Sequence, residues 1–309
     1  MISQTDATTI SARGLTRRFG AHAAVKKVDL ELRRGEVLGF LGPNGAGKTT
    51  TMQMLTGNLA PTEGEISICG IDMLARPVAA KAKIGYLPET PPLYRDLTVD
   101  EYLTLAAKLH RVPKSRRRDA LANAKERCGI SDVSRKLIGS LSKGYQQRVG
   151  IAQAIAHEPE VVILDEPTVG LDPNQIREIR SLIRELGLRF SVILSTHILP
   201  EVEAICDRVQ IMHHGDIVYS DTISALKALH SGRAVRVGLK RPPLEPELAA
   251  VPGVASVENI GANLYRIQFD ADGGASEAFA RHAVGRDWGL FELAPAQTSL
   301  EDVFVNLTQ

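Results

Sequence analysis

The chain has 309 residues, of which 44% are hydrophobic and 24% are charged, so its composition excludes a disordered protein and its length suggests about two domains. Lys and Arg (37) balance Asp and Glu (36), and the net charge of +1 predicts no general attraction to nucleic acid. The three widely spaced cysteines argue against a disulfide framework or a zinc site and favour a reducing cytoplasm. No apolar run approaches the ~18 residues that span a bilayer, so work at a membrane would need a partner.

The first part of the chain predicts a strand, loop and helix unit. Apolar and polar residues alternate over Ile10–Leu15 and Val25–Leu32, which predicts two half-exposed strands. The uninterrupted apolar run Val37–Leu41 predicts a buried strand. A helix is expected from about Gly47 to Leu55, with Gly57 as its C-terminal stop.

The middle of the chain, about residues 90–158, has a helical pattern. Thr98 and Glu101 have the spacing of a capping box at the start of one of these helices. Parallel-type strands are expected again at Val161–Leu164 and Ser191–Ser195, on either side of a helix over Gln175–Leu186. The pattern therefore predicts an α/β domain with a doubly wound sheet and a helical insertion.

The last part of the chain, from about residue 232, changes character. Alternating strands and two helices follow one another in the order β-α-β-β-α-β, which is typical of a small α+β, ferredoxin-like domain. We therefore expect a first domain over residues 1–231 and a C-terminal accessory domain over residues 232–309.

The junction between the first buried strand and its helix matches GxxxxGK[ST], the phosphate-binding P-loop. Glycines let backbone N–H groups point at phosphate oxygens, and the helix N-terminus adds a partial positive charge. Lys48 is expected to bind the β and γ phosphates, and the Thr49 hydroxyl to bind Mg²⁺. The expected nucleotide-binding residues here are Gly42, Pro43, Asn44, Gly45, Ala46, Gly47, Lys48, Thr49 and Thr50.

Two adjacent carboxylates, Asp165 and Glu166, follow the apolar run Val161–Leu164. The carboxyl end of a parallel strand is where open α/β sheets place their ligands. Asp165 suits a Mg²⁺ contact, and Glu166 suits orientation and partial deprotonation of an attacking water. Together with the P-loop, the pair predicts hydrolysis of a nucleotide by Lys48 and Glu166.

The sequence resembles the ATP-binding subunits of ABC transporters over about residues 10–229. Beyond the two motifs above, the segment Leu141–Arg148 (LSKGYQQR) looks like the LSGGQ signature of that family. The resemblance implies a P-loop NTPase (RecA-like) core with a helical subdomain at about residues 90–158. It also implies that Ser142 and Gly144 contact ATP bound to the opposite subunit, so that a nucleotide-sandwich dimer completes each site.

Three further positions take their roles from the resemblance. His197 resembles the switch histidine that contacts the γ phosphate, and Gly170–Asp172 resembles the D-loop of the dimer interface. Phe19 lies where the family stacks an aromatic ring on adenine. An ordinary packing role remains the alternative for Phe19, and a plain turn is the alternative for residues 170–172.

The chain also departs from the family pattern at three positions. Lys143 and Tyr145 replace the usual glycine and glutamine of the signature, and Glu89 stands where the Q-loop normally has glutamine. A carboxylate at residue 89 can bind Mg²⁺, but it would also repel the γ phosphate. These departures leave open a subunit that binds ATP without hydrolysing it.

Three segments resemble the corresponding sequences in the ATPases of ABC-2-type exporters. They are the signature, Leu171–Gln175 and Ser299–Phe304. That resemblance implies an ATP- and Mg²⁺-dependent motor, peripheral on the inner face of the cell membrane, that works with a separate permease. The alternative is an ABC-type ATPase acting on ribosomes or DNA. The single P-loop and the absence of sustained heptads favour the transporter, and no nucleic-acid partner is expected.

Overall fold

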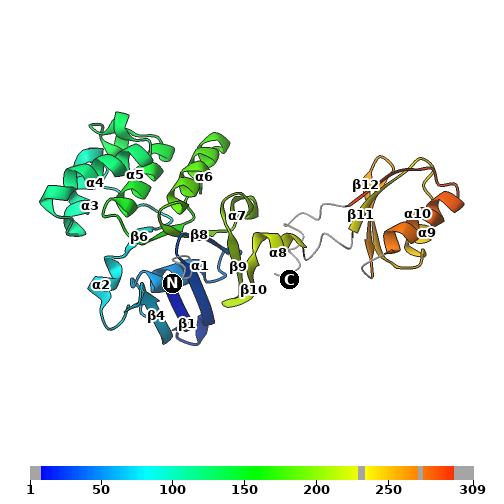
Figure 1. The fold of residues 1–309 in the computed structure, drawn as a ribbon, viewed down its shortest axis with the longest axis horizontal. Helices are drawn as coiled ribbons and strands as arrows, with labels where there is room; N and C mark the ends of the chain where they lie inside the picture. Colours follow the sequence, from blue (N-terminus) through cyan, green and yellow to red (C-terminus); the bar gives the residue numbers. More distant parts are fainter. Residues whose placement is uncertain (1–7, 229–233, 271–273, 296–309) are drawn as a thin grey trace, which may run out of the picture. The chain divides into compact units, whose positions relative to one another are not determined.

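The computed structural model describes residues 8–228, 234–270 and 274–295, and it divides into two compact units, Met1–Asp221 and Thr222–Gln309 (Figure 1). The division falls about ten residues before the boundary expected from the sequence, which lies at residues outside the described ranges. The Ser299–Phe304 segment also lies outside them.

A six-stranded sheet forms the centre of the first unit, in the order β10-β9-β3-β8-β7-β6. The pairs β9–β3, β3–β8, β8–β7 and β7–β6 are parallel. The strands β3 and β7 are buried along their whole length, as their uninterrupted apolar runs predict. The strands are β3 (Val37–Leu41), β6 (Ile84–Leu87), β7 (Val161–Asp165), β8 (Ser191–Thr196), β9 (Arg208–His213) and β10 (Asp216–Thr222).

A second sheet of the first unit has the order β2-β1-β4-β5. Its three strand pairs are antiparallel, and the long β1–β2 pair contains several register shifts. The alternating strands turn one face to a hydrophobic core that also includes residues of β3, β7 and α1. The elements are β1 (Thr8–Phe19), β2 (His22–Arg33), β4 (Glu63–Ile68), β5 (Ile71–Asp72) and α1 (Lys48–Leu55).

Helices α3, α4 and α5 form the helical part that the sequence predicts, and they pack against one another (Figure 1). The capping box of α3 is confirmed: the Thr98 hydroxyl accepts from the Glu101 N–H, and the Glu101 carboxylate accepts from the Thr98 N–H. The remaining helices of the first unit are α2, α6 and α7. Their bounds are α2 (Pro77–Lys81), α3 (Val99–Leu109), α4 (Lys114–Arg127), α5 (Lys143–Ile155), α6 (Pro173–Gly187) and α7 (Leu199–Ile205), with short 3₁₀ turns at Ser131–Val133 and Ile138–Ser140.

The second unit begins with α8 (Ile223–Ala228) and contains a four-stranded sheet with two helices. Its elements follow the order β11-α9-β12-β13-α10-β14, and the sheet order is β12-β13-β11-β14 with antiparallel neighbours. Residues of both helices, among them Leu248 and Phe279, join its core. The bounds are β11 (Ala234–Leu239), α9 (Glu245–Ala249), β12 (Val254–Gly261), β13 (Leu264–Phe269), α10 (Ala275–Gly285) and β14 (Leu290–Pro295).

Candidate functional site

The P-loop joins β3 to α1, and Lys48 is the first residue of that helix. Its ammonium group is buried and donates hydrogen bonds to the carbonyl oxygens of Gly42 (2.9 Å) and Pro43 (3.3 Å). Gly47 has a φ of 110°, and a Cβ there would lie 2.5 Å from the Ala24 carbonyl oxygen, so only glycine fits. The loop therefore holds a cation at the positive end of a helix, where phosphate oxygens bind favourably.

Asp165 ends β7 and is fully buried beside this loop. Burial raises the pKa of its carboxyl group, and the nearby Glu166 raises it further, whereas the Ser195 and Thr49 hydroxyls lower it. Neither carboxylate oxygen makes a hydrogen bond of ordinary geometry with the described residues. A buried carboxylate beside the Thr49 hydroxyl offers hard oxygen ligands, and this chemistry fits Mg²⁺.

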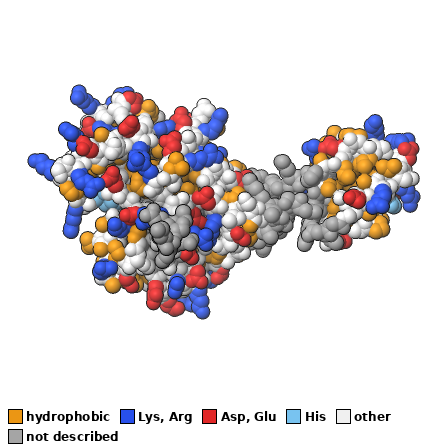
Figure 2. All heavy atoms as spheres, in the orientation of Figure 1, with side chains coloured by type: hydrophobic (Ala, Val, Ile, Leu, Met, Phe, Trp, Pro, Cys, Tyr) orange, Lys and Arg blue, Asp and Glu red, His pale blue; other side chains and the backbone are white. Residues whose placement is uncertain are grey.

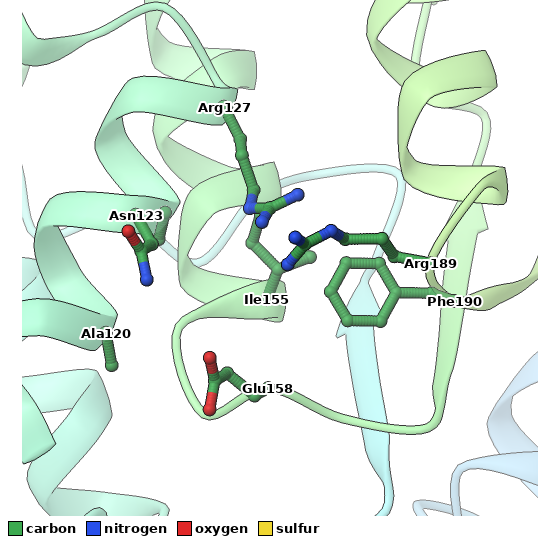
Figure 3. Close-up of a pocket in the computed structure, with 8 residues that line it drawn as sticks. Ala120, Asn123, Arg127, Ile155, Glu158, Arg189 and Phe190 are labelled. Carbon is green, nitrogen blue, oxygen red and sulfur yellow. The ribbon is translucent and has the colours of Figure 1, made fainter.

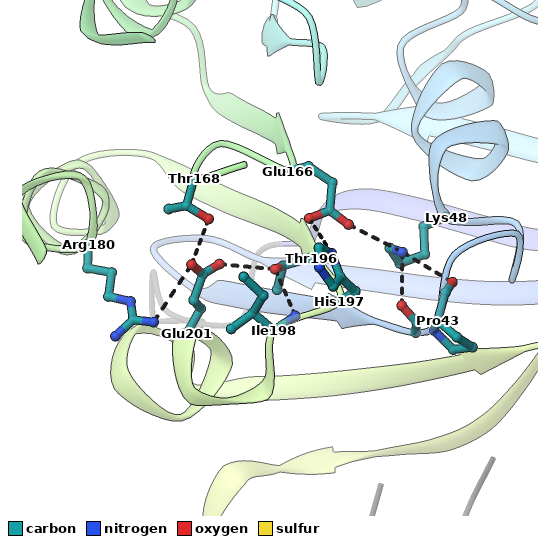
Figure 4. Close-up of polar contacts among 10 residues, drawn as sticks. Pro43, Lys48, Glu166, Thr168, Arg180, Thr196, His197, Ile198 and Glu201 are labelled. Atoms are coloured by element: carbon teal, nitrogen blue, oxygen red, sulfur yellow. Dashed lines mark hydrogen bonds and ion pairs between the residues drawn. The ribbon is translucent and has the colours of Figure 1, made fainter. Parts of the chain in front are cut away.

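Glu166 lies between Lys48 and His197 in a chain of polar contacts (Figure 4). Its Oε1 is 3.3 Å from the Lys48 ammonium nitrogen, and its Oε2 is 2.9 Å from Nδ1 of His197. The residue has a φ of 49°, which is uncommon for a side chain larger than glycine, and its N–H donates to the Ser195 carbonyl oxygen. This backbone conformation orients the carboxylate between the lysine and the histidine.

Glu201 belongs to the hydrogen-bond network of this site, and the sequence patterns did not predict that role. It lies in α7 with no exposed surface, and its carboxylate accepts hydrogen bonds from the hydroxyls of Thr168 (2.6 Å) and Thr196 (3.0 Å) (Figure 4). Those threonines lie two residues after Glu166 and one residue before His197. The buried carboxylate thus links the two segments that carry the candidate catalytic groups.

Arg180 of α6 completes this network, with Nη2 at 3.7 Å from Glu201 Oε1. Burial of a carboxylate is unfavourable unless the group is paired with a cation and hydrogen-bonded. Here the guanidinium group supplies the positive charge, and the two threonine hydroxyls supply the hydrogen bonds. The only sequence signal was a glutamate between the buried positions of a short apolar helix, Leu199–Ile205. A glutamate at such a position is recognised as buried only when the packing of α7 is known.

A pocket of about 380 Å³ brings four separate predicted segments together. The P-loop, Glu89, Glu166 and His197 all line it, so the Q-loop position does face the site despite its substitution. Ala24 and Val169, which the sequence did not single out, also line it. The lining residues are Ala24, Asn44, Gly45, Gly47, Lys48, Thr49, Thr50, Glu89, Glu166, Val169 and His197.

Phe19, Ser142 and Gly144 do not line this pocket. Phe19 is half-exposed, and the Arg17 guanidinium lies 4.7 Å from the centre of its ring. Ser142 caps α5 by accepting a hydrogen bond from the Tyr145 N–H (3.4 Å). A Cβ on Gly144 would lie 2.8 Å from the Gln175 side chain, so this buried glycine permits close packing of α5 against α6.

Comparison with known proteins identifies the family. The ABC transporter family model matches residues 25–169, and an AAA-domain model matches residues 138–202. The uncharacterized ABC transporter ATP-binding protein YxlF of Bacillus subtilis is 34% identical over 96% of this chain and 99% of its own length. The bacitracin transport ATP-binding protein BcrA of Bacillus licheniformis is 39% identical over 71% of this chain and 72% of its own.

Solved structures confirm the fold of the first unit. An ATP-binding subunit of an ABC transporter is 31% identical with a TM-score of 0.65, covering 72% of this chain and 93% of that one. The cbiO1 protein of Clostridium perfringens is 30% identical with a TM-score of 0.66 over 72% and 92% of the two chains. The expected α/β P-loop NTPase core is therefore confirmed. The chain belongs to the ATP-binding subunits of ABC transporters and is an ATPase.

Proposed function

We propose that two copies of this chain hydrolyse ATP at composite sites and thereby drive a separate permease that exports a small compound. The observation that supports this most strongly is the pocket in which the P-loop, Glu89, Glu166 and His197 meet. Within one subunit Ser142 and Gly144 lie away from that pocket, which is the arrangement expected if they act on ATP held by the partner subunit.

Each site residue has a role that its surroundings support. Lys48 leaves its two carbonyl partners to bind the β and γ phosphates, while loop N–H groups hold the remaining phosphate oxygens. Glu166 accepts a proton from the attacking water, and His197, held by that carboxylate, contacts the γ phosphate. Thr49 and Asp165 would hold Mg²⁺, which supplies charge stabilisation when bound, and Glu89 faces the same space.

The printed names of relatives support the transport part of the proposal. BcrA is named as a bacitracin transport protein, and the linearmycin resistance ATP-binding protein LnrL of Bacillus subtilis is 30% identical over 97% of this chain. We therefore propose export of a drug-like compound by an ABC-2-type transporter, with this subunit at the inner face of the membrane. In the described residues, no helix has both the length and the apolarity to cross a membrane.

Exposed apolar side chains on either side of Glu89 in the sequence are candidates for contact with the permease. Val78 of α2 and Tyr94, in the segment that follows Glu89, are each more than half exposed. Contiguous exposed apolar patches mark binding sites for other proteins, and we propose that these two side chains form part of one. In Figure 2, by contrast, basic and acidic side chains are interspersed on the visible face of the first unit, and we propose no nucleic-acid partner.

A complementation experiment tests the composite site. The Lys48→Ala chain has a defective P-loop, and the Ser142→Arg chain has a defective signature, so each alone should form dimers with two defective sites. In a mixed dimer one site carries both defects, and the other site is intact. Mixing the two inactive proteins should therefore restore part of the ATPase activity.

Ser142 is exposed, whereas Lys48 is buried at the start of α1, so circular dichroism of each variant should be compared with that of the wild type to check that it remains folded. Activity of the mixture equal to the sum of the two separate proteins would contradict the composite site. A mixture of Lys48→Ala with Lys48→Arg is the matched control, because neither chain supplies an intact P-loop.

A further inference from the structure

A second pocket, of about 260 Å³, lies at the opposite end of the central sheet from the ATP site. Its residues Glu158 and Phe190 come just before the parallel strands β7 and β8, whereas Asp165 and His197 come at or just after their ends. None of its lining residues lines the ATP pocket. The two sites are therefore separated by the length of these strands.

Small side chains on α4 create the hollow. Ala120 and Ala124 are four residues apart, so they share the helix face that lines the pocket, and both are buried. Their methyl groups do not fill the space opposite Ile155 and Phe190, which are also buried. The pocket therefore has an apolar wall made by the end of α5 and the residue before β8.

Two arginines converge on this hollow, Arg127 and Arg189. Figure 3 shows the guanidinium groups of Arg127, from α4, and Arg189, from the segment before β8, turned toward one another. Neither makes a hydrogen bond or ion pair through its side chain with any residue that the structure describes. The acidic residue of the lining, Glu158, is paired with Arg116 at 2.8 Å instead.

Two arginines on one hollow favour the binding of an anion. Two guanidinium groups that face one space repel each other, and a shared anion converts that repulsion into two attractions. The planar fork of arginine matches phosphate in a bidentate manner, and the Asn123 amide lies on the same wall as a further donor. The apolar wall with Phe190 would contact an organic group attached to the phosphate.

We infer that this pocket binds a small organic phosphate, with Arg127 and Arg189 holding the phosphate group and Ile155 and Phe190 contacting the organic part. The volume is smaller than that of the ATP pocket, which favours a ligand smaller than a nucleotide. Arg127 belongs to the helical part and Arg189 to the sheet part. A bound phosphate would therefore join the two parts of the first unit at a point far from the ATP site.

Calorimetric titration of the full chain tests the inference, with the ATP site saturated by Mg–ADP and the ionic strength held constant. The probes are phenyl phosphate and inorganic phosphate. We expect phenyl phosphate to bind more tightly, and we expect Arg127→Gln and Arg189→Gln each to weaken its binding at least tenfold. Arg76→Gln, at an exposed arginine of the same unit outside the pocket, is the matched control and should leave binding unchanged.

Three outcomes would overturn the inference. The first is that the wild-type chain binds neither probe. The second is that the wild type and both pocket variants bind phenyl phosphate equally well. The third is that Arg76→Gln weakens this binding as much as the pocket variants do. Equal affinity for the two phosphates would refute the contact with an organic group. The Mg–ADP affinity of each variant, measured in parallel, shows that the protein is folded and that the ATP site is intact. The inference does not depend on the composite-site mechanism, so either can fail alone.

Discussion

The Nδ1 atom of His197 lies 2.9 Å from Oε2 of Glu166, although the two residues belong to segments that follow different strands. With the carboxylate ionised, Nδ1 is the donor of this hydrogen bond, so the imidazole ring has a defined tautomer and orientation. The other carboxylate oxygen lies 3.3 Å from the Lys48 ammonium nitrogen. Glu166 thus orients both neighbours, and its removal should affect more than one step.

Glu166→Gln should abolish turnover while ATP binding persists. The amide keeps the shape of the side chain but cannot accept a proton from water, so we expect kcat to fall by about 10²–10³. Steady-state phosphate release measures this, and nucleotide titration measures binding. Glu185→Gln, at an exposed position of α6, is the control. Retention of a tenth or more of the wild-type kcat would show that another group is the base.

Glu201→Gln should lower both stability and kcat, without direct contact with ATP. The amide has one acceptor oxygen where the carboxylate has two, and its NH₂ group brings two donors near Thr168, Thr196 and Arg180. At least one of these buried partners therefore loses its hydrogen bond. A loss of about 1–3 kcal/mol in the free energy of unfolding is expected. Urea denaturation measures it.

The kinetic signature distinguishes positioning by Glu201 from a purely structural role. If the network holds Glu166 and His197 in place, kcat should fall at a temperature where the variant is fully folded, with little change in KM. Glu185→Gln, at the exposed position of α6, is again the control. An unchanged kcat in folded Glu201→Gln protein would show that the network serves stability alone.

Stability should fall as the pH is lowered from about 6.5 to 4, in part because of His157. Burial, together with the smaller effect of the stacked neighbour His110, lowers the pKa of this imidazole to about 4, although its hydrogen bond to the Ile84 carbonyl oxygen opposes the shift. The unfolded chain therefore binds a proton in this range before the folded chain does. Between pH 6.5 and pH 4, the decrease in the free energy of unfolding that is attributable to His157 is on the order of 3 kcal/mol.

His157→Gln should remove that part of the pH dependence, and His22→Gln, at an exposed position, should not. Urea denaturation at several pH values between 4 and 7 measures the slopes. Identical slopes for the wild type and His157→Gln would show that the ring is accessible to protons in the folded state.

Thr98→Ala should lower the free energy of unfolding by about 1 kcal/mol, because the Thr98 hydroxyl that accepts from the Glu101 N–H and donates to the Glu101 carboxylate is lost. Thr104→Ala lies inside the same helix without a capping role and should be neutral or slightly stabilising. Denaturation curves of the two variants give the comparison. Equal effects at both positions would contradict a specific cap.

Local residue patterns were sufficient for the P-loop, the α3 cap and the buried strands β3 and β7. In the P-loop and the cap, the interacting groups lie within a few residues of one another, so their spacing along the chain already defines the geometry. For the strands, the uninterrupted apolar run by itself predicts burial on both faces of a sheet. The strands β4, β5 and β6 and the helices α2, α7 and α8 were not predicted. Runs of two to seven residues carry too few periods to distinguish a strand or helix from a loop, and packing against neighbours decides their conformation.

By itself, the sequence determined the chemistry of this protein: a phosphate-binding loop, adjacent carboxylates after a buried strand, and the family signature, all of which are local motifs. Only the tertiary structure decided that Glu89 faces the ATP pocket, that Glu201 joins Thr168 to Thr196, and that Arg127 and Arg189 share one hollow. The physical reason is that burial and charge pairing depend on which distant segments the packed sheet and helices bring together, and composition or periodicity does not specify those contacts.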